Sequence, residues 1–251
     1  MKLKNWLGIS ALATLGVAAP VQADTVLGLT AGAQVWDMDG KGGIGTAGQP
    51  QSGDLDFAKD KQNVYYVALE HPIPLIPNIK LKHTDLESRG TGSVNFTFEG
   101  STFTGDVTTD VDFSHNDIIL YYELLDNVVS LDLGLNVMQM DGFVTVTEDA
   151  NPANRERVDF DGYLPTLYIA AQAELPLTGL SIGGEFSGLA VGDSSFYDYQ
   201  VQIQYNVIDN MAIDVGIQLG YRETRLELDD VDNLDTDLTF SGPYAGLQVH
   251  F

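Results

Sequence analysis

The sequence predicts an all-β protein, a closed antiparallel transmembrane β-barrel of about ten strands. The first observation is hydrophobic alternation with a period of two. From Val129 to Val137 every odd position is apolar and every even position is polar or glycine, which gives an extended strand one aliphatic and one polar face. The second observation is length. Such segments run for about ten residues, as a tilted bilayer-spanning strand requires, whereas strands of soluble sheets commonly have five or six.

The third observation is that short and long connections alternate. The expected strands cover 25–36, 63–71, 78–87, 112–124, 128–139, 158–174, 179–190, 195–206, 211–224 and 237–251. Short turns join some of them, at 72–77, 125–127, 175–178 and 207–210, and longer acidic, glycine-rich loops join the others, at 37–62, 88–111, 140–157 and 225–236. Outer-membrane barrels place short turns in the periplasm and long loops outside. Residues 93–98 predict a small extension hairpin in the second long loop, so eight or twelve strands are the alternative counts.

Both ends of the chain indicate export to the outer membrane of a Gram-negative bacterium. Residues 1–23 form a basic, then apolar, then small-residue segment that predicts a cleaved signal peptide, leaving 24–251 as one barrel domain. The last strand alternates and ends in an aromatic residue, which resembles the insertion signal read by the outer-membrane assembly machinery. Its residues are Tyr244, Leu247, Val249 and Phe251.

Composition excludes several kinds of chemistry. The chain contains no cysteine, so disulfides and thiolate ligands are excluded. Its formal net charge of −24 at pH 7 would repel the phosphate backbone of a nucleic acid. Tyrosines at strand ends predict aromatic girdles at the membrane interfaces, and Trp36 is a further expected interfacial aromatic. These tyrosines are Tyr65, Tyr163, Tyr197, Tyr205 and Tyr221.

The polar faces of the strands predict the lining of the barrel lumen. The expected lumen residues are Glu70, Lys80, Lys82, Asp132, Glu185, Asp198, Gln200, Gln202, Gln204, Asp214 and Gln218, with Gln172 beside them. Glu70 and Lys80 lie symmetrically about one turn and are expected to pair, and the glutamines are expected to cross-link neighbouring strands. Polar side chains would then fill a narrow lumen. The alternative is a small cation-preferring channel.

Two His-x-Asp pairs are the candidate catalytic residues. An outer-membrane protease would be expected to carry an Asp-x-His pair and a second acidic pair near the outer rim. Here the order is reversed, in His83 with Asp85 and in His115 with Asp117. If both pairs meet near the outer ends of two strands, a rim hydrolase is the enzymatic alternative. Interfacial or loop histidines without catalysis are the simpler interpretation.

Acidic loops supply candidate ligands for calcium, a cation that prefers oxygen. The candidates are Asp37, Asp39, Asp229, Asp230 and Asp232. Residues 37–45 read DMDGKGGIG and match an EF-hand at their first, third and sixth positions, but Lys41 and Gly48 replace two ligands. We therefore expect the start of a loop and no EF-hand, no cofactor, and at most a loop-bound calcium ion.

One stretch has a more specific resemblance. Residues 66–81, YVALEHPIPLIPNIKL, lead one strand through a proline-rich turn into the next, and residues 23–29 read ADTVLGL. With the general layout, these two motifs resemble a family of predicted outer-membrane β-barrel proteins of Gram-negative bacteria, named for its co-occurrence with the GlyGly-CTERM sorting system. The resemblance implies location and fold, and it carries no catalytic or ligand motif.

The sequence therefore predicts an integral outer-membrane protein with a structural or surface-interaction role. Its expected partners are outer-membrane lipid, lipopolysaccharide and the assembly machinery, with no nucleic acid. The cation channel and the rim hydrolase remain alternatives of function. A soluble periplasmic ligand-binding barrel is the alternative architecture.

Overall fold

The computed structural model describes residues 27–48, 52–53, 55–210, 212–231 and 234–251. The predicted signal peptide lies outside the described residues. Twelve strands form the described structure: β1 (Gly28–Thr46), β2 (Leu55–Glu70), β3 (Asn78–Thr84), β4 (Glu87–Phe98), β5 (Ser101–Asp112), β6 (His115–Leu125), β7 (Val129–Glu148), β8 (Asn151–Leu175), β9 (Leu180–Val191), β10 (Ser194–Asn210), β11 (Ile213–Val231) and β12 (Leu234–His250). Within these residues, no helix is long and apolar enough to span a bilayer.

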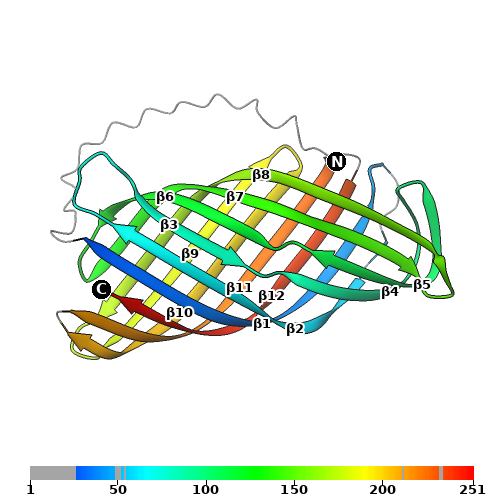
Figure 1. Cartoon of the computed structure of the whole chain (residues 1–251). Helices are drawn as coiled ribbons and strands as arrows, with labels where there is room; N and C mark the ends of the chain where they lie inside the picture. Colours follow the sequence, from blue (N-terminus) through cyan, green and yellow to red (C-terminus); the bar gives the residue numbers. More distant parts are fainter. Residues whose placement is uncertain (1–26, 49–51, 54, 211, 232–233) are drawn as a thin grey trace.

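Ten of the strands close a barrel in which all neighbours are antiparallel, in the order β1, β2, β3, β6, β7, β8, β9, β10, β11 and β12 (Figure 1). Closure is made between β1 and β12, where Thr30 faces His250 and the pairing continues to Thr46 and Leu234. The backbones of Leu29 and Phe251 exchange two further hydrogen bonds, of 3.2 and 2.9 Å. The predicted fold class is confirmed.

The remaining two strands, β4 and β5, form the extension hairpin that residues 93–98 predicted, and it is longer than expected. β4 continues the line of β3, and β5 leads into β6, so the hairpin fills the wall between β2 and β7. Glu99 and Gly100 form its turn with φ values of 48° and 84°. Two successive positive φ values are typical of the two-residue turn that matches the twist of a hairpin.

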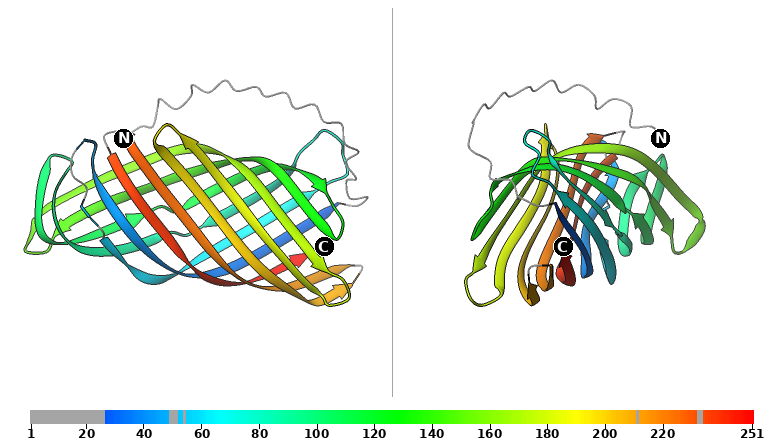
Figure 2. Two further views of the ribbon diagram at one scale, coloured as in Figure 1. Left: turned by 180° about the vertical axis from the view of Figure 1, so that it is seen from behind. Right: turned by 60° about the vertical axis from the view of Figure 1, so that its left-hand side comes forward.

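Most residues of the predicted long loops are strand residues instead. β7 and β8 extend to a connection of two residues, Asp149 and Ala150. The segment DMDGKGGIG lies within β1 and is therefore not the start of a loop. Figure 2 shows long oblique strands that continue to both ends of the barrel.

The barrel has two halves with opposite patterns of burial. We call the half that holds Gly28, Phe251 and the turn at 126–128 the terminal half, and the half that holds β4 and β5 the distal half. In the terminal half, aliphatic side chains such as Val35, Leu135 and Leu247 point outward and are exposed. In the distal half, apolar side chains point inward and form the largest apolar core.

The change occurs along single strands because the apolar side chains switch from odd to even positions. On β1, Leu29 and Val35 are exposed, whereas Trp36 and Met38 are fully buried. On β7 the switch separates exposed Leu135 from buried Val144, and on β12 it separates exposed Leu247 from buried Phe240 and Leu238. Side chains of a strand alternate between faces, so the outside is apolar in one half and the inside is apolar in the other.

Candidate functional site

A cavity of about 370 Å³ occupies the interior of the terminal half. Its mouth includes Asp126 and Asn127 of the turn between β6 and β7, and its wall continues inward to Glu185 on β9. All predicted lumen residues except Lys82 and Asp198 line it: Glu70, Lys80, Asp132, Gln172, Glu185, Gln200, Gln202, Gln204, Asp214 and Gln218. The cavity is therefore a polar vestibule.

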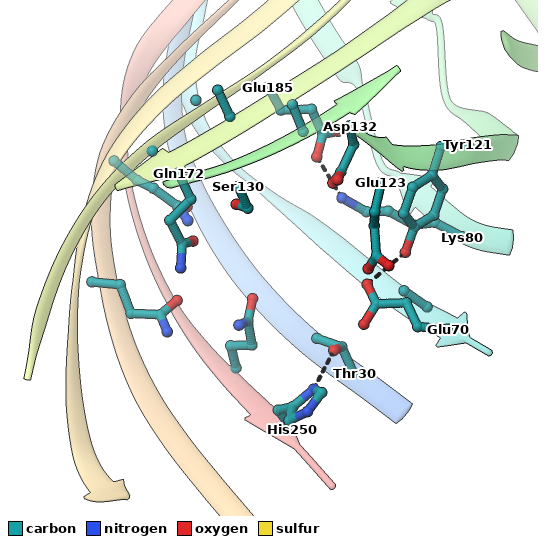
Figure 3. Close-up of a pocket in the computed structure, with 18 of the residues that line it drawn as sticks. Thr30, Glu70, Lys80, Tyr121, Glu123, Ser130, Asp132, Gln172, Glu185 and His250 are labelled. Atoms are coloured by element: carbon teal, nitrogen blue, oxygen red, sulfur yellow. Dashed lines mark hydrogen bonds and ion pairs between the residues drawn. The ribbon is translucent and has the colours of Figure 1, made fainter. Parts of the chain in front are cut away.

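One side of the cavity gathers charged groups and tyrosines around Lys80 (Figure 3). The Lys80 ammonium pairs with the carboxylate of Glu185 across the barrel. It also lies 4.9 Å from the centre of the Tyr66 ring. Glu70 does not form the predicted pair with Lys80. In the register of β2 and β3, Lys80 faces Ala68, and Glu70 instead accepts a 2.7 Å hydrogen bond from the hydroxyl of Tyr121.

Amide side chains from β10, β11 and β12 form another part of the wall. Gln218 donates hydrogen bonds of 3.0 Å to the side-chain oxygens of Gln204 and Gln248. Gln34 on β1 donates to Gln218 over 3.2 Å, and Tyr66 donates to Gln248 over 2.8 Å. These bonds link five strands across the interior, as small barrels with side-chain-filled centres require.

A layer of charged and polar side chains closes the inner end of the cavity, and we call it the ion layer: Lys82, His115, Asp117, Glu185, Asp198 and Arg222. Arg222 binds both carboxylate oxygens of Asp198, at 2.8 and 2.6 Å. Lys82 lies 3.0 Å from Glu185 and 3.5 Å from Asp198. Buried charges are tolerated when opposite charges and hydrogen bonds surround them. The ion layer therefore joins β3, β6, β9, β10 and β11 in the middle of the barrel.

The distal interior beyond the ion layer is apolar, which the sequence analysis did not predict. Its buried residues are Trp36, Met38, Ile44, Leu55, Phe57, Leu86, Val94, Phe96, Phe98, Phe103, Val107, Val111, Phe113, Val144, Val146, Leu238, Phe240 and Tyr244. Trp36 connects the two regions. Its ring lies 4.9 Å from the guanidinium of Arg222, and its indole nitrogen donates to the carbonyl of Gly242 over 3.2 Å. Polar side chains therefore line an open cavity in the terminal half, and apolar side chains fill the distal half.

The comparisons with known proteins identify a similar fold. The structure of the outer membrane protease OmpT from Escherichia coli matches with a TM-score of 0.55 at 12% identity, over 89% of this chain and 97% of that one. A FadL homologue from Pseudomonas aeruginosa matches with a TM-score of 0.30 at 9% identity, over 90% of each chain. No protein-family model matches the sequence, and no curated protein matches it either.

The fold is that of an outer-membrane β-barrel. This likeness applies to the backbone architecture, because an identity of 12% carries no active-site residues from one chain to the other. The name of OmpT describes a protease activity of that protein alone. The chemistry available to this barrel follows from its own side chains.

The two candidate catalytic pairs lie on opposite faces of the barrel wall, so the expectation that they meet is wrong. His83 is half exposed on the outside, with its Nε2 3.0 Å from Asp85 and its Nδ1 2.9 Å from Asn116. His115 and Asp117 are buried inside, with 3.7 Å between their nearest polar atoms. In the register of β3 and β6, His83 faces Asn116 and Thr84 faces His115. Neighbouring residues of a strand point to opposite faces, which separates the pairs.

The calcium candidates have other environments. Asp37 forms a 3.1 Å ion pair with Lys59, and Asp39 is exposed on the same outer face of β1. The backbone nitrogen of Asp229 donates to the hydroxyl of Ser194 over 3.0 Å. The side chain of Asp230 and all of Asp232 lie outside the described residues. In the described part of the chain, no group of three or more Asp, Glu or His side chains is placed to hold a metal ion.

The residues of the predicted insertion signal occupy both faces of β12. Leu247 and Phe251 are exposed on the outside, whereas Tyr244 is buried inside and donates a 2.7 Å hydrogen bond to Gln202. Tyr65 and Tyr163 are among the exposed outer tyrosines. Trp36, expected at the outer interface, is instead fully buried inside the barrel. The even position of Trp36 explains the error, because the apolar face has already changed sides at that point.

The outer surface of the distal half carries polar and charged side chains. The guanidinium carbon of Arg157 on β8 lies 3.8 Å from the centre of the Phe143 ring on the outer face of β7. It also donates a 2.8 Å hydrogen bond to Asp159, and this bond lowers the pKa of the Asp159 carboxyl below its ordinary value. Several further carboxylates are exposed there: Asp39, Asp56, Asp60, Glu87, Glu99, Asp106, Asp141, Asp149, Asp161 and Asp229.

Proposed function

We propose that the protein is an integral outer-membrane protein whose barrel anchors a rigid structure on the cell surface, where it has a structural or interaction role. The reversal of the apolar face along β1, β7 and β12 is the observation that supports this. An apolar exterior suits lipid, and an apolar interior with a polar exterior suits water. The terminal half is therefore suited to the membrane and the distal half to the aqueous phase beyond it.

The orientation follows from the strand extensions. Outer-membrane barrels have their longer extensions outside the membrane, and here β4, β5 and the extended parts of β7 and β8 lie in the distal half, opposite the chain end at Phe251. The distal half would then extend outward with its exposed carboxylates. Such a surface suits contact with lipopolysaccharide through bridging divalent cations and repels nucleic acid. Assembly through the last strand, and the likeness of residues 66–81 to the GlyGly-CTERM-associated family, complete the proposal.

The conducting alternative is less well supported by the geometry. A channel requires a continuous polar path, and the described distal interior is lined by aromatic and aliphatic side chains such as Phe98, Phe103 and Val146. The ion layer also spans the interior below them. The rim hydrolase is not favoured either, because the wall of the barrel separates its two pairs.

The proposal can be tested with single cysteines, since the natural chain has none. Asp106→Cys places a thiol at an exposed distal position, and Asn127→Cys places a matched thiol at the exposed turn of the terminal half. We expect a membrane-impermeant maleimide to label Asp106→Cys on intact cells, and to label Asn127→Cys after the outer membrane is permeabilised.

Fractionation of the same cells separates the architectures. We expect both variants in the outer-membrane fraction, with gel mobility that changes on heating. Recovery in the soluble periplasmic fraction would favour the ligand-binding barrel. Labelling of Asn127→Cys but not Asp106→Cys on intact cells would reverse the orientation and refute a surface role for the distal half.

A further inference from the structure

The vestibule of the terminal half has the dimensions of a binding site. Its volume of about 370 Å³ falls within the range of small-molecule sites, about 300 to 1,000 Å³. It opens beside Asp126 and Asn127 and ends at the ion layer, where Lys80 and Lys82 both contact Glu185. A solute that enters from the terminal end therefore meets a closed inner wall.

The charge of the wall is strongly unbalanced. Among the residues that the structure describes, seven carboxylates line the cavity: Glu70, Glu123, Asp126, Asp132, Glu174, Glu185 and Asp214. Among the described lining residues, Lys80 is the single lysine, and Glu185 already binds its ammonium. Carboxylates that share a partly enclosed space repel one another and attract cations more strongly than they would in bulk water.

Lys80 shows which kind of cation the wall accommodates. Its primary ammonium is held by the carboxylate of Glu185 and by the faces of Tyr66 and Tyr168, whose ring centres lie 4.9 and 5.8 Å away. Carboxylates and aromatic faces are the usual partners of an alkylammonium group. Nearby, the Glu70 carboxylate accepts a 2.7 Å hydrogen bond from the hydroxyl of Tyr121, which places a second carboxylate beside a tyrosine.

Figure 3 shows how these groups are placed around the cavity. Glu70, Glu123 and Asp132 gather near Lys80 and Tyr121, and Gln172 and Ser130 lie further along the wall. The glutamines that line the described part of the cavity supply neutral acceptors and donors: Gln172, Gln200, Gln202, Gln204, Gln218 and Gln248. A ligand with separated ammonium groups would thus meet carboxylates at one end and amide oxygens along its length.

We propose that this vestibule binds a small aliphatic diamine or polyamine that enters from the terminal end. Glu70 and Asp132 receive one ammonium group, the ring of Tyr121 covers it, and the glutamine amides accept hydrogen bonds from the remaining nitrogens. A second cation also relieves the repulsion between the lining carboxylates. The site lies in the terminal half and does not depend on the surface role proposed for the distal half.

Isothermal titration calorimetry of the folded full-length protein in detergent tests the proposal, with putrescine and spermidine as ligands and Mg²⁺ and glucose as comparison solutes. We expect saturable heat with both amines. The double variant Glu70→Gln, Asp132→Asn should weaken their affinity by about tenfold or more, because it removes the charge-assisted hydrogen bonds. The matched control Asp39→Asn, Asp106→Asn removes two exposed carboxylates outside the cavity, and it should bind the amines as the natural protein does.

Three results would overturn the proposal: no saturable binding of either amine, equal losses of affinity in the two double variants, or Mg²⁺ binding with the same affinity and the same sensitivity to Glu70→Gln, Asp132→Asn. Heat-modifiable gel mobility verifies that each variant is folded. If the double variant fails this control, the single Asp132→Asn substitution takes its place, and an affinity equal to that of the natural protein would then refute the role of this wall.

Discussion

Single residues at the middle of the barrel show how strictly position determines environment. Val35 and Trp36 are adjacent on β1, yet the first is exposed on the outside and the second is fully buried inside. Arg222 is equally buried because Asp198 neutralises it and the Trp36 ring covers it. Hydrophobicity alone would bury Val35 and expose Arg222. The two-residue period of the strands and the charge partners determine instead which side chain is buried.

Trp36 provides a direct test at the residue scale. It is the sole tryptophan of residues 24–251, and its ring lies inside the barrel. In bilayers made of lipids with brominated acyl chains, we therefore expect its fluorescence to be quenched weakly. The matched variant Trp36→Phe, Tyr163→Trp moves the indole to an exposed outer position and should be quenched strongly. Equal quenching of the two proteins would contradict the inward placement of Trp36.

The hairpin of β4 and β5 is the element that completes the distal core. Phe98 and Phe103 are fully buried, and the ring centres of Phe96 and Phe103 lie 5.8 Å apart. The hairpin pairs with β2 and β7 at its two edges. It therefore closes the wall and fills the interior at the same time, which a mobile loop at the same place would not do.

Phe98→Ala should weaken this element in particular. Removing a buried phenylalanine side chain commonly costs about 3–5 kcal/mol, because the apolar contacts are lost and a cavity remains. We expect hydrogen exchange to accelerate in β4 and β5 while the amides of β9 to β12 in the terminal half stay protected. Leu247→Ala, on the exposed outer face, is the control and should leave β4 and β5 unchanged. Uniform acceleration in all strands would show that the halves unfold together.

The strand pattern of the terminal half could be predicted from sequence, and the distal half could not. Leu131, Leu133 and Leu135 mark β7 because a run of aliphatic residues on one face is a strong signal. After Val137 the apolar residues move to even positions, at Met138, Val144 and Val146, and a search for one constant face stops there. Allowing the apolar face to change sides would have extended β1 and β7.

The candidate site was predictable in composition but not in contacts. Glu70, Lys80 and Gln218 were assigned to the interior because strand alternation places them there. Their partners depend on which strands meet across the barrel, as when Lys80 on β3 reaches Glu185 on β9. Arg222 was missed for a similar reason, although it lies four residues after Gln218 on the same inward face. Pairs between distant strands leave no spacing signal in the sequence.

At the scale of the whole molecule, the interior consists of three layers: a polar cavity, the ion layer and an apolar core. Each layer meets a different requirement. The cavity is open at the terminal end, the ion layer ties five strands together, and the apolar core stabilises the distal half of the barrel. The layers are stacked along the axis, so the described interior narrows to packed side chains towards the distal end.

This stacking predicts that the purified, folded protein does not conduct. In planar bilayers at high salt we expect no discrete current steps, because ions would have to displace the distal aromatic side chains and cross the ion layer. Liposome swelling with small sugars should likewise show no uptake. Stepwise currents that track the folded, heat-modifiable form of the protein would instead support the cation-channel alternative.

The change of apolar face along each long strand also protects the pairing of the strands. If a strand slipped by one residue against its neighbours, all of its side chains would exchange faces. Leucines of the terminal half would enter the hydrated cavity, and at the same time phenylalanines of the distal half would enter water, at about 1.5–3 kcal/mol for each large apolar side chain. A single mispairing therefore costs free energy in both halves of the barrel at once, and the correct alignment is favoured at both ends of the same strand.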